Sequence, residues 1–326
     1  MSAAPVTLDV RLDPATVRAA LERDAAGGLT SMPKTLPAVW FYDEAGSDLF
    51  DEITRLDAYY PTREERALLV EHATDIAAAT GAVTLVELGA GTCTKTRILL
   101  DAMRDAGTLR RYVAVDVAES TLLTATTSIA ADYPGLEVTA TIADFEGLEG
   151  LVRHDGPTVI AFLGGTVGNL EPAQRHRFLT SLDAELDHGD HLLLGTDLVK
   201  DRVRLVAAYD DPQGVTAEFN RNVLRVLNRE LGADFDVDSF IHVARFDEEH
   251  QWIEMRLRAQ GAQHVAIPGL GIEIDFDDQE EMRTEISAKF TPEGIGAELE
   301  AGGFVVDHQF GARRGEFLLT LAHPYC

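Results

Sequence analysis

The chain of 326 residues has little cysteine and little positive charge. Its two cysteines, Cys93 and Cys326, cannot form a disulfide framework or a four-ligand zinc site, and such low cysteine usage fits a reducing compartment. Aspartate and glutamate number 55 against 28 lysines and arginines, which gives a net charge of −27. Because nucleic-acid phosphates and anionic membranes attract positive charge, we expect neither as a partner.

Long apolar segments are also missing from the sequence. No apolar run approaches the roughly 18 residues of a membrane-spanning helix. The first residues lack the basic region followed by an apolar stretch that is typical of a signal peptide. The 45% hydrophobic and 25% charged residues are ordinary for globular proteins, so we expect a soluble, cytoplasmic enzyme. We expect it to act as a monomer on a small-molecule substrate.

Two common chemical signatures are absent or incomplete. The sequence has no Gly-x-Ser-x-Gly elbow, so it gives no support for acyl transfer through a serine. Asp234, Asp236 and Asp238 imitate the start of a calcium-binding loop. However, Ser239 occupies the place that needs glycine, and Arg245 occupies the place that needs glutamate. We interpret this stretch as a solvated acidic segment and expect no bound metal.

Strand-like runs that alternate with helical segments predict a parallel sheet. The runs are 83–88, 112–116, 136–141, 158–163 and 191–196, and the helices between them include 95–105 and 118–132. Strands joined by helices at this spacing form βαβ units. The runs are apolar on both faces, as a sheet covered on both sides requires. Two further strands, at 304–310 and 316–321, are expected to pair with each other.

The predicted fold class is therefore α/β, with a Rossmann-like doubly wound sheet and a terminal antiparallel strand pair. The length suggests about two domains. We assign 63–199 and 289–326 to the doubly wound domain, and 1–62 and 200–288 to a second, α+β domain made of two separated segments. The other expected elements are helices at 15–26, 62–79 and 202–230 and strands at 252–257, 265–267, 271–276 and 284–290. The pattern Thr62-Arg63-Glu64-Glu65 predicts a capping box at the start of the second of these helices.

The strongest chemical signal is Glu87-Leu88-Gly89-Ala90-Gly91, at the end of the first strand of the sheet. Glycines there allow the backbone to approach a dinucleotide or S-adenosylmethionine closely. Thr94 stands where a dinucleotide fingerprint needs its third glycine, and Lys95 does not complete a phosphate-binding loop. A carboxylate at Glu87 suits a cationic amino-acid ligand and disfavours pyrophosphate. The loop therefore predicts S-adenosylmethionine as cosubstrate.

Carboxylates at the next two strand ends agree with this interpretation. Asp116 ends the second strand, where it can accept both ribose hydroxyls of a nucleoside. Asp144 and Phe145 follow the third strand, where the carboxylate can accept the adenine amino group. Ligands of such sheets bind at the carboxyl ends of the strands, where all these residues lie. The arrangement resembles the class I methyltransferase fold, with Thr92 in place of the third glycine of many members.

Three other stretches are candidates for a substrate site. The aromatic cluster around Trp40-Phe41-Tyr42 and Tyr59-Tyr60 either packs the core of a helical cap or forms a lid whose ring faces accept cations. Asn169 follows the fourth strand, where its amide either grips an amino-acid substrate or satisfies the loop backbone. Glu285 and Ser287 share one face of a predicted strand.

Together these segments resemble the histidine Nα-methyltransferases of ergothioneine biosynthesis, over almost the whole chain. The matching segments are Trp40-Phe41-Tyr42-Asp43, Gly46-Ser47-Asp48-Leu49-Phe50, Tyr59-Tyr60-Pro61-Thr62-Arg63, Glu87-Leu88-Gly89-Ala90-Gly91, Gly164-Gly165-Thr166-Val167-Gly168-Asn169, Trp252-Ile253-Glu254-Met255-Arg256-Leu257 and Thr284-Glu285-Ile286-Ser287. Several of them lie outside the generic methyltransferase motifs, which makes the resemblance specific.

The resemblance implies three successive methyl transfers from S-adenosylmethionine to the α-amine of L-histidine, which give hercynine. It implies that Asn169 and Tyr209 hold the substrate carboxylate and that Tyr42 and Gly164 face the amine. It also implies that Phe50, Tyr59 and Met255 line the pocket and that Glu285 and Ser287 bind the imidazole. The residues implied to bind the cosubstrate are Gly89, Lys95, Asp116, Asp144 and Phe145, in addition to Glu87 and Gly91 of the glycine loop. The alternatives are a class I methyltransferase for another small amine or an aromatic amino acid such as tryptophan, and a non-catalytic S-adenosylmethionine sensor.

Overall fold

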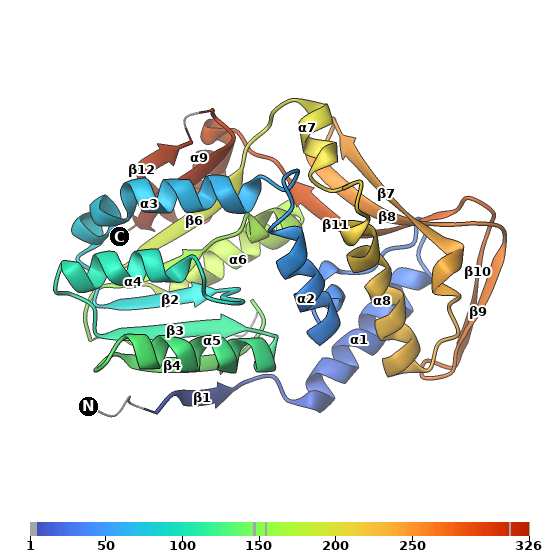
Figure 1. Ribbon diagram of the computed structural model, residues 1–326, viewed down its shortest axis with the longest axis horizontal. Helices are drawn as coiled ribbons and strands as arrows, with labels where there is room; N and C mark the ends of the chain where they lie inside the picture. Colours follow the sequence, from blue (N-terminus) through green and yellow to red (C-terminus); the bar gives the residue numbers. More distant parts are fainter. Residues whose placement is uncertain (1–4, 146–147, 154, 313, 326) are drawn as a thin grey trace. The chain divides into compact units, whose positions relative to one another are not determined.

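The computed structural model describes residues 5–145, 148–153, 155–312 and 314–325. They divide into two compact units, each assembled from separated pieces of the chain (Figure 1). The first unit contains the residues up to Leu12, Pro61–Val199 and the residues from Lys289 onward. The second unit contains Asp13–Tyr60 and Lys200–Ala288.

The first unit is built on an eight-stranded sheet in the order β1-β4-β3-β2-β5-β6-β13-β12. Its strands are β1 Thr7–Val10, β2 Thr84–Leu88, β3 Arg111–Asp116, β4 Glu137–Ile142, β5 Thr158–Phe162, β6 His191–Asp197, β12 Phe304–Gly311 and β13 Phe317–Pro324. β1 to β6 pair in parallel, whereas β13 is antiparallel to both β6 and β12. The strand order reverses between β2 and β5, which is the topological switch point where ligands bind in such sheets. The predicted doubly wound sheet with a terminal antiparallel pair is confirmed.

Helices cover both faces of this sheet, as apolar central strands require. Every residue of β2 and β5 is therefore buried. The helices are α3 Pro61–Thr80, α4 Thr96–Asp105, α5 Glu119–Asp132, α6 Pro172–Glu185 and α9 Pro292–Ala301. α3 packs against α4 and α6 packs against α9 (Figure 1). Leu85, Leu100, Tyr112 and Leu193 are fully buried in the core between these layers.

The strand β1 differs from the sequence prediction, which placed residues 1–62 in the second domain. β1 pairs with β4 at the edge of the sheet, with Thr7 opposite Thr139. The strand is only four residues long, and Leu8 and Val10 remain 45% and 54% exposed. Such a short edge strand has no continuous apolar run, so no sequence pattern predicted it.

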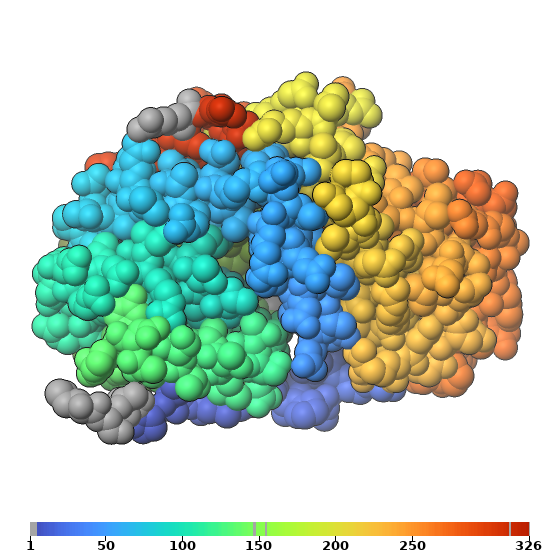
Figure 2. Space-filling view, in the orientation of Figure 1, coloured from blue at the N-terminus to red at the C-terminus, as the bar shows by residue number. Residues whose placement is uncertain are grey.

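The second unit combines helices with two small antiparallel sheets, of order β11-β8-β7 and β10-β9. Its strands are β7 Phe240–Asp247, β8 Trp252–Ala259, β9 Gln263–Ile267, β10 Ile272–Phe276 and β11 Glu281–Ala288. Its helices are α1 Pro14–Leu29, η1 Ala38–Phe41, α2 Glu44–Ile53, α7 Arg202–Ala207, α8 Val215–Leu231 and η3 Val237–Ser239. α8 packs on β7 and β8. α2 packs on α8, and Figure 2 shows the two helices side by side in blue and gold.

Two predictions for this unit are corrected by the structure. The helix expected at 202–230 is interrupted, because Gly214 adopts a left-handed conformation and the Asp211 carboxylate accepts the amides of Val215 and Thr216. The helix α7 has already ended at Ala207, and the Asp211 carboxylate holds the first amides of α8. The strand β7 was not predicted, because most of its residues are only half-buried and its apolar alternation is weak. Among the described helices, none has the length and hydropathy needed to cross a bilayer.

Candidate active site

The glycine loop after β2 has a backbone that requires glycine. Gly89 and Gly91 have φ angles of 67° and 51°, which side chains disfavour. The amides of Gly89 and Ala90 both donate to the carbonyl of Val115, which ties the loop to β3. A Cβ atom added to Gly89 would lie 3.7 Å from the Phe145 ring. The loop therefore brings together two of the predicted cosubstrate residues.

Asp116 is held by the main chain at the end of β3. One carboxylate oxygen accepts the Gly91 amide at 2.8 Å, and the other accepts the Ala118 amide at 2.9 Å. Burial raises the pKa of this carboxyl above its usual range. Asp144 and Phe145 follow β4, and the Phe145 ring packs edge-on against Phe162 with centroids 4.9 Å apart. Left-handed glycines beside a fixed carboxylate fit an adenosyl ligand.

Glu87 is buried within β2 and already has protein partners. Its Oε2 atom accepts the Tyr112 hydroxyl at 2.8 Å and also accepts the hydroxyl of Thr96, in the first turn of α4. Loss of solvent raises the pKa of Glu87 to about 7. Its carboxylate therefore ties α4 to the sheet beneath the glycine loop, and its predicted contact with the cosubstrate stays a prediction.

Lys95 forms an ion pair with Glu65, a residue that the sequence assigned to a capping box. The prediction for Glu65 is wrong, because this carboxylate is fully buried and its Oε1 atom accepts the Gly164 amide at 2.7 Å. A Cβ atom on Gly195 would lie 2.2 Å from the same oxygen, so glycine in β6 makes room for it. Glu65 therefore joins Lys95 of the predicted cosubstrate site to Gly164 of the predicted amine site.

The loop after β5 turns on two consecutive left-handed glycines. Gly164 and Gly165 have φ angles of 80° and 70°. The following 3-10 turn, Thr166–Asn169, satisfies its own backbone, since the Gly165 carbonyl accepts the Gly168 amide at 2.9 Å. Half-buried Asn169 ends this turn beyond the carboxyl end of β5, where sheets of this kind bind their ligands.

In the second unit, the predicted substrate residues form a continuous aromatic wall. The ring centroids of Tyr42 and Phe50 are 5.7 Å apart, those of Phe50 and Tyr59 are 6.2 Å apart, and those of Tyr59 and Tyr209 are 6.0 Å apart. Phe219 of α8 contacts both Tyr42 and Phe50. All three wall contacts are edge-on, and Tyr59 and Tyr209 are buried, so this cluster packs the core of the unit. Its role as a lid that accepts cations stays a prediction.

The local backbone explains how Tyr42 is placed in this wall. Asp43 caps α2 by accepting the Gly46 amide at 2.8 Å, and Asn222 of α8 donates to the same carboxylate at 2.7 Å. A Cβ atom on Gly46 would lie only 1.7 Å from the carbonyl oxygen of Phe41. Glycine is therefore required where α2 crosses the preceding turn.

The polar end of the wall lies on the strands β8 and β11. The Tyr209 hydroxyl is 2.8 Å from the Ser287 hydroxyl. In the strand register, Glu285 lies opposite Met255 and Ser287 lies opposite Ile253. Directly paired residues share a face, so Met255, Glu285 and Ser287 face the same side. The structure thus brings Tyr209 and these three predicted residues together.

Four functional candidates escaped the sequence analysis. Glu65, described above, was one; the others are Asn220, His242 and Thr284, the last of which lies in a matching segment but was given no role. The Asn220 side chain hydrogen-bonds to both His242 and Thr284. Local spacing gives no signal for them, because they come from α8, β7 and β11. Only the register of the sheet, with a bulge between Arg283 and Glu285, brings them together.

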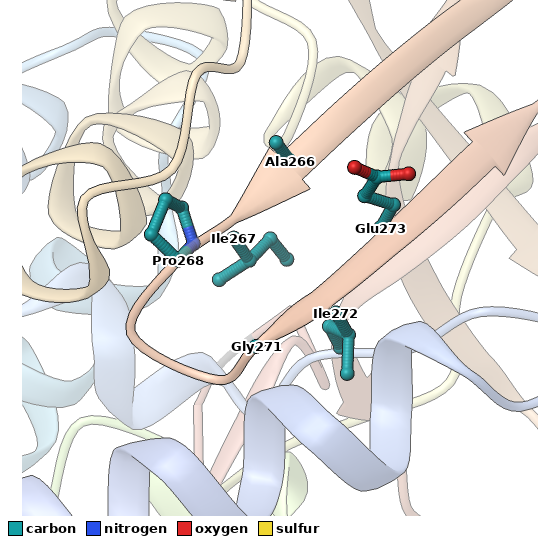
Figure 3. Close-up of a pocket in the computed structure, with 6 residues that line it drawn as sticks. All are labelled: Ala266, Ile267, Pro268, Gly271, Ile272 and Glu273. Carbon is teal, nitrogen blue, oxygen red and sulfur yellow. The ribbon is translucent and has the colours of Figure 1, made fainter.

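A hollow of about 360 Å³ lies at the hairpin between β9 and β10 (Figure 3). It is lined by Ala266, Ile267, Pro268, Gly271, Ile272 and Glu273. None of these was predicted as a site residue, and Glu273 supplies the single carboxylate of this lining. The hollow is therefore separate from the residues described above.

Comparison with known proteins identifies the family. The family model of histidine-specific, S-adenosylmethionine-dependent methyltransferases matches residues 21–324. The chain is 55% identical over 303 residues to the histidine N-alpha-methyltransferase of Mycolicibacterium smegmatis, covering 93% of this chain and 94% of that protein. It is 53% identical, with the same coverage, to the histidine N-alpha-methyltransferase of Mycobacterium tuberculosis. It is also 31% identical to ergothioneine biosynthesis protein 1 of Neurospora crassa, covering 66% of this chain and 26% of that protein.

The chain therefore belongs to the family of histidine-specific, S-adenosylmethionine-dependent methyltransferases. The resemblance inferred from the sequence motifs is confirmed, and so is the prediction of a methyltransferase enzyme. The strand order of the first unit, with its antiparallel terminal pair, is the class I methyltransferase architecture.

Proposed function

We propose that the protein trimethylates the α-amine of L-histidine and so produces hercynine in the first step of ergothioneine biosynthesis. The observation that carries this proposal is the 55% identity to a histidine N-alpha-methyltransferase over 93% of the chain. We further propose that it acts as a cytoplasmic monomer, with no metal and no nucleic-acid or membrane partner.

The chemistry makes few covalent demands on the protein. S-adenosylmethionine, when bound, supplies a methyl group that is already activated by its sulfonium. The protein has to hold a neutral amine in line with that methyl group, about 3 Å away, and to exclude water. The residues that matter most are therefore those that bind and orient.

In the first unit, we assign Gly89, Gly91, Asp116, Asp144 and Phe145 to the nucleoside part of S-adenosylmethionine. The fixed Asp116 carboxylate suits two ribose hydroxyls, because its two oxygens are held by amides that leave further acceptor capacity. We assign Lys95 and Glu87 to the amino-acid end of the cosubstrate. Gly164 and Asn169, from the loop after β5, are assigned to the amine and the carboxylate of histidine.

In the second unit, we assign Tyr42 to the amine, Tyr209 to the carboxylate, and Phe50, Tyr59 and Met255 to the walls. Glu285 and Ser287 are assigned to the imidazole, whose two nitrogens need partners when buried. The aromatic wall suits the product as well as the substrate. A trimethylated nitrogen keeps its charge but has no N–H left to donate, so ring faces are the partners that still stabilise it.

The direct test is incubation with S-adenosylmethionine and each amino acid in turn, followed by mass spectrometry. We expect histidine to gain one, two and then three methyl groups, and the other amino acids to remain unmodified. Preferential methylation of tryptophan or another amine would favour the first alternative. Binding of S-adenosylmethionine without methylation of any substrate would favour a sensor.

A further inference from the structure

A buried polar network lies within the second unit, where an apolar core would be the simpler solution. It contains Asn220 of α8, His242 of β7 and Thr284 of β11. Asn220 and Thr284 are both 0% exposed. Because burying polar groups is costly unless each finds a partner, their hydrogen bonds need a complete account.

The carbonyl of Arg256 fixes the direction of the network. It can only accept, and Asn220 Nδ2 lies 3.0 Å from it, so this amide nitrogen is the donor. The same nitrogen lies 2.8 Å from His242 Nδ1, which must therefore accept. The imidazole proton is then on Nε2, which donates to the Tyr209 carbonyl at 2.7 Å.

At the other end of the network, the Thr284 hydroxyl has two acceptors within reach, of which the Met255 carbonyl, at 3.1 Å, is the more distant. Asn220 Oδ1 accepts the Thr284 hydroxyl at 2.6 Å. Every polar atom of the network thus has a partner when His242 is neutral. Burial lowers the pKa of His242, which agrees with a neutral ring.

Both ends of the network meet residues that were assigned to the substrate. One end holds the main chain of Tyr209. The other holds Thr284, which is the extra residue of the bulge that places Glu285 opposite Met255. A slip of one residue in a strand turns its side chains to the opposite face, so an anchored bulge fixes the direction of Glu285.

We infer that Asn220, His242 and Thr284 are positioning residues that preorganise Tyr209 and Glu285 for histidine. This inference rests on the proposed function. Without the network, Glu285 and Tyr209 would have to be ordered when histidine binds, and the cost would weaken histidine binding. S-adenosylmethionine binding, which we assign to residues of the first unit, should not change.

The test compares Thr284→Val, which removes the hydroxyl at nearly constant shape, with Thr284→Ser, which keeps it. Thr320→Val is the matched control, because this threonine in β13 is fully buried and its hydroxyl has no hydrogen-bond partner among the described residues. The measurements are kcat and KM for histidine, the Kd of S-adenosylmethionine by calorimetry, and the Tm of each variant. Asn220→Ser is a second disruption of the network in case Thr284→Val does not fold.

We expect Thr284→Val to raise the KM for histidine about tenfold, which is the size of one lost buried hydrogen bond. The kcat and the Kd of S-adenosylmethionine should stay within about twofold, and Thr284→Ser and Thr320→Val should resemble the wild type. An unchanged KM in Thr284→Val, or an equal loss of affinity for both ligands, would overturn the inference. Failure of the wild type to methylate histidine would instead overturn the proposed function.

Discussion

The glycine loop and Asp116 of the first unit are held by the main chain, whereas the aromatic wall of the second unit is held by side chains. In the first unit, amides of Gly91 and Ala118 fix Asp116, and the amide of Gly164 fixes Glu65. In the second unit, rings pack on rings, and Tyr209 contacts Ser287 through hydroxyls. The comparison suggests that a cosubstrate common to many enzymes is read by a fixed backbone, and that a particular substrate is read by exchangeable side chains.

The largest expected effect concerns Glu285. Glu285→Ala should lower kcat/KM for histidine by a factor that corresponds to a loss of about 2–4 kcal/mol in transition-state stabilisation, because the imidazole loses a charged partner and a cavity remains. The freed volume should also relax the rejection of phenylalanine and tryptophan. The measurement is kcat/KM for the three amino acids, with Glu273→Ala in β10 as the matched loss of a carboxylate. If Glu285→Ala keeps the wild-type preference for histidine, Glu285 does not read the imidazole.

Asp116 tests the same comparison from the other unit. Asp116→Ala should weaken S-adenosylmethionine binding at least tenfold, since a hydrogen bond to a charged group contributes about 1.5–3 kcal/mol. Calorimetry on the folded variant measures the Kd, and Asp105→Ala at the exposed end of α4 is the control. An unchanged affinity would remove Asp116 from the site.

Substitution of Gly46 tests the placement of the aromatic wall through the free energy of unfolding of the protein. Gly46→Ala should lower the free energy of unfolding by about 1–3 kcal/mol, because its Cβ atom would collide with the Phe41 carbonyl. Gly27→Ala in α1 is the matched control, since a Cβ atom there meets no atom within 4 Å. That helical substitution should stabilise the protein by about 0.5–1 kcal/mol. Urea unfolding measures both, and similar effects in the two variants would contradict the close approach at Gly46.

The last expected effect is a pH dependence of stability that originates at Glu87. Burial raises the pKa of Glu87 to about 7 in the folded protein from its ordinary value of 4.5, so the folded state binds more protons between these two values. The contribution of Glu87 to stability therefore falls as pH rises through this window and levels off above it. Glu87→Gln cannot titrate and should lack this slope in urea unfolding at pH 5, 6, 7 and 8. A wild-type stability that rises relative to Glu87→Gln over the same range would contradict the raised pKa.

The same contrast explains what the sequence could predict. Gly89, Gly91 and Asp116 follow predictable strands, so sheet topology alone brought them to one edge. Glu65 was misassigned because Thr-x-x-Glu is a capping box by its local pattern, and only the three-dimensional structure shows its partners Lys95 and Gly164. Substrate roles for Tyr42, Phe50, Tyr59 and Tyr209 were implied by family resemblance, but their edge-on contacts with one another are known only from the structure.

The bulge at Thr284 and the strand register that it sets could not be predicted from the alternation of side chains along the strand. A strict alternation places Glu285 and Ser287 on one face but does not say which neighbours share it. The extra residue shifts the register, so that Glu285 joins Met255 instead of Glu254. No local signal in the sequence distinguishes the two registers, because the bulge is held by Asn220 from a distant helix.

The interleaving of the two units has a consequence for synthesis on the ribosome. The chain passes between the units at residues 12–13, 60–61, 199–200 and 288–289. All of the second unit has therefore been synthesised before β13, which pairs with β6, leaves the ribosome. During that interval the edge of β6 is an open row of backbone donors and acceptors that other strands can join. In nascent chains of this protein, the edge of β6 in the first unit is accordingly exposed to mispairing until β13 has been synthesised.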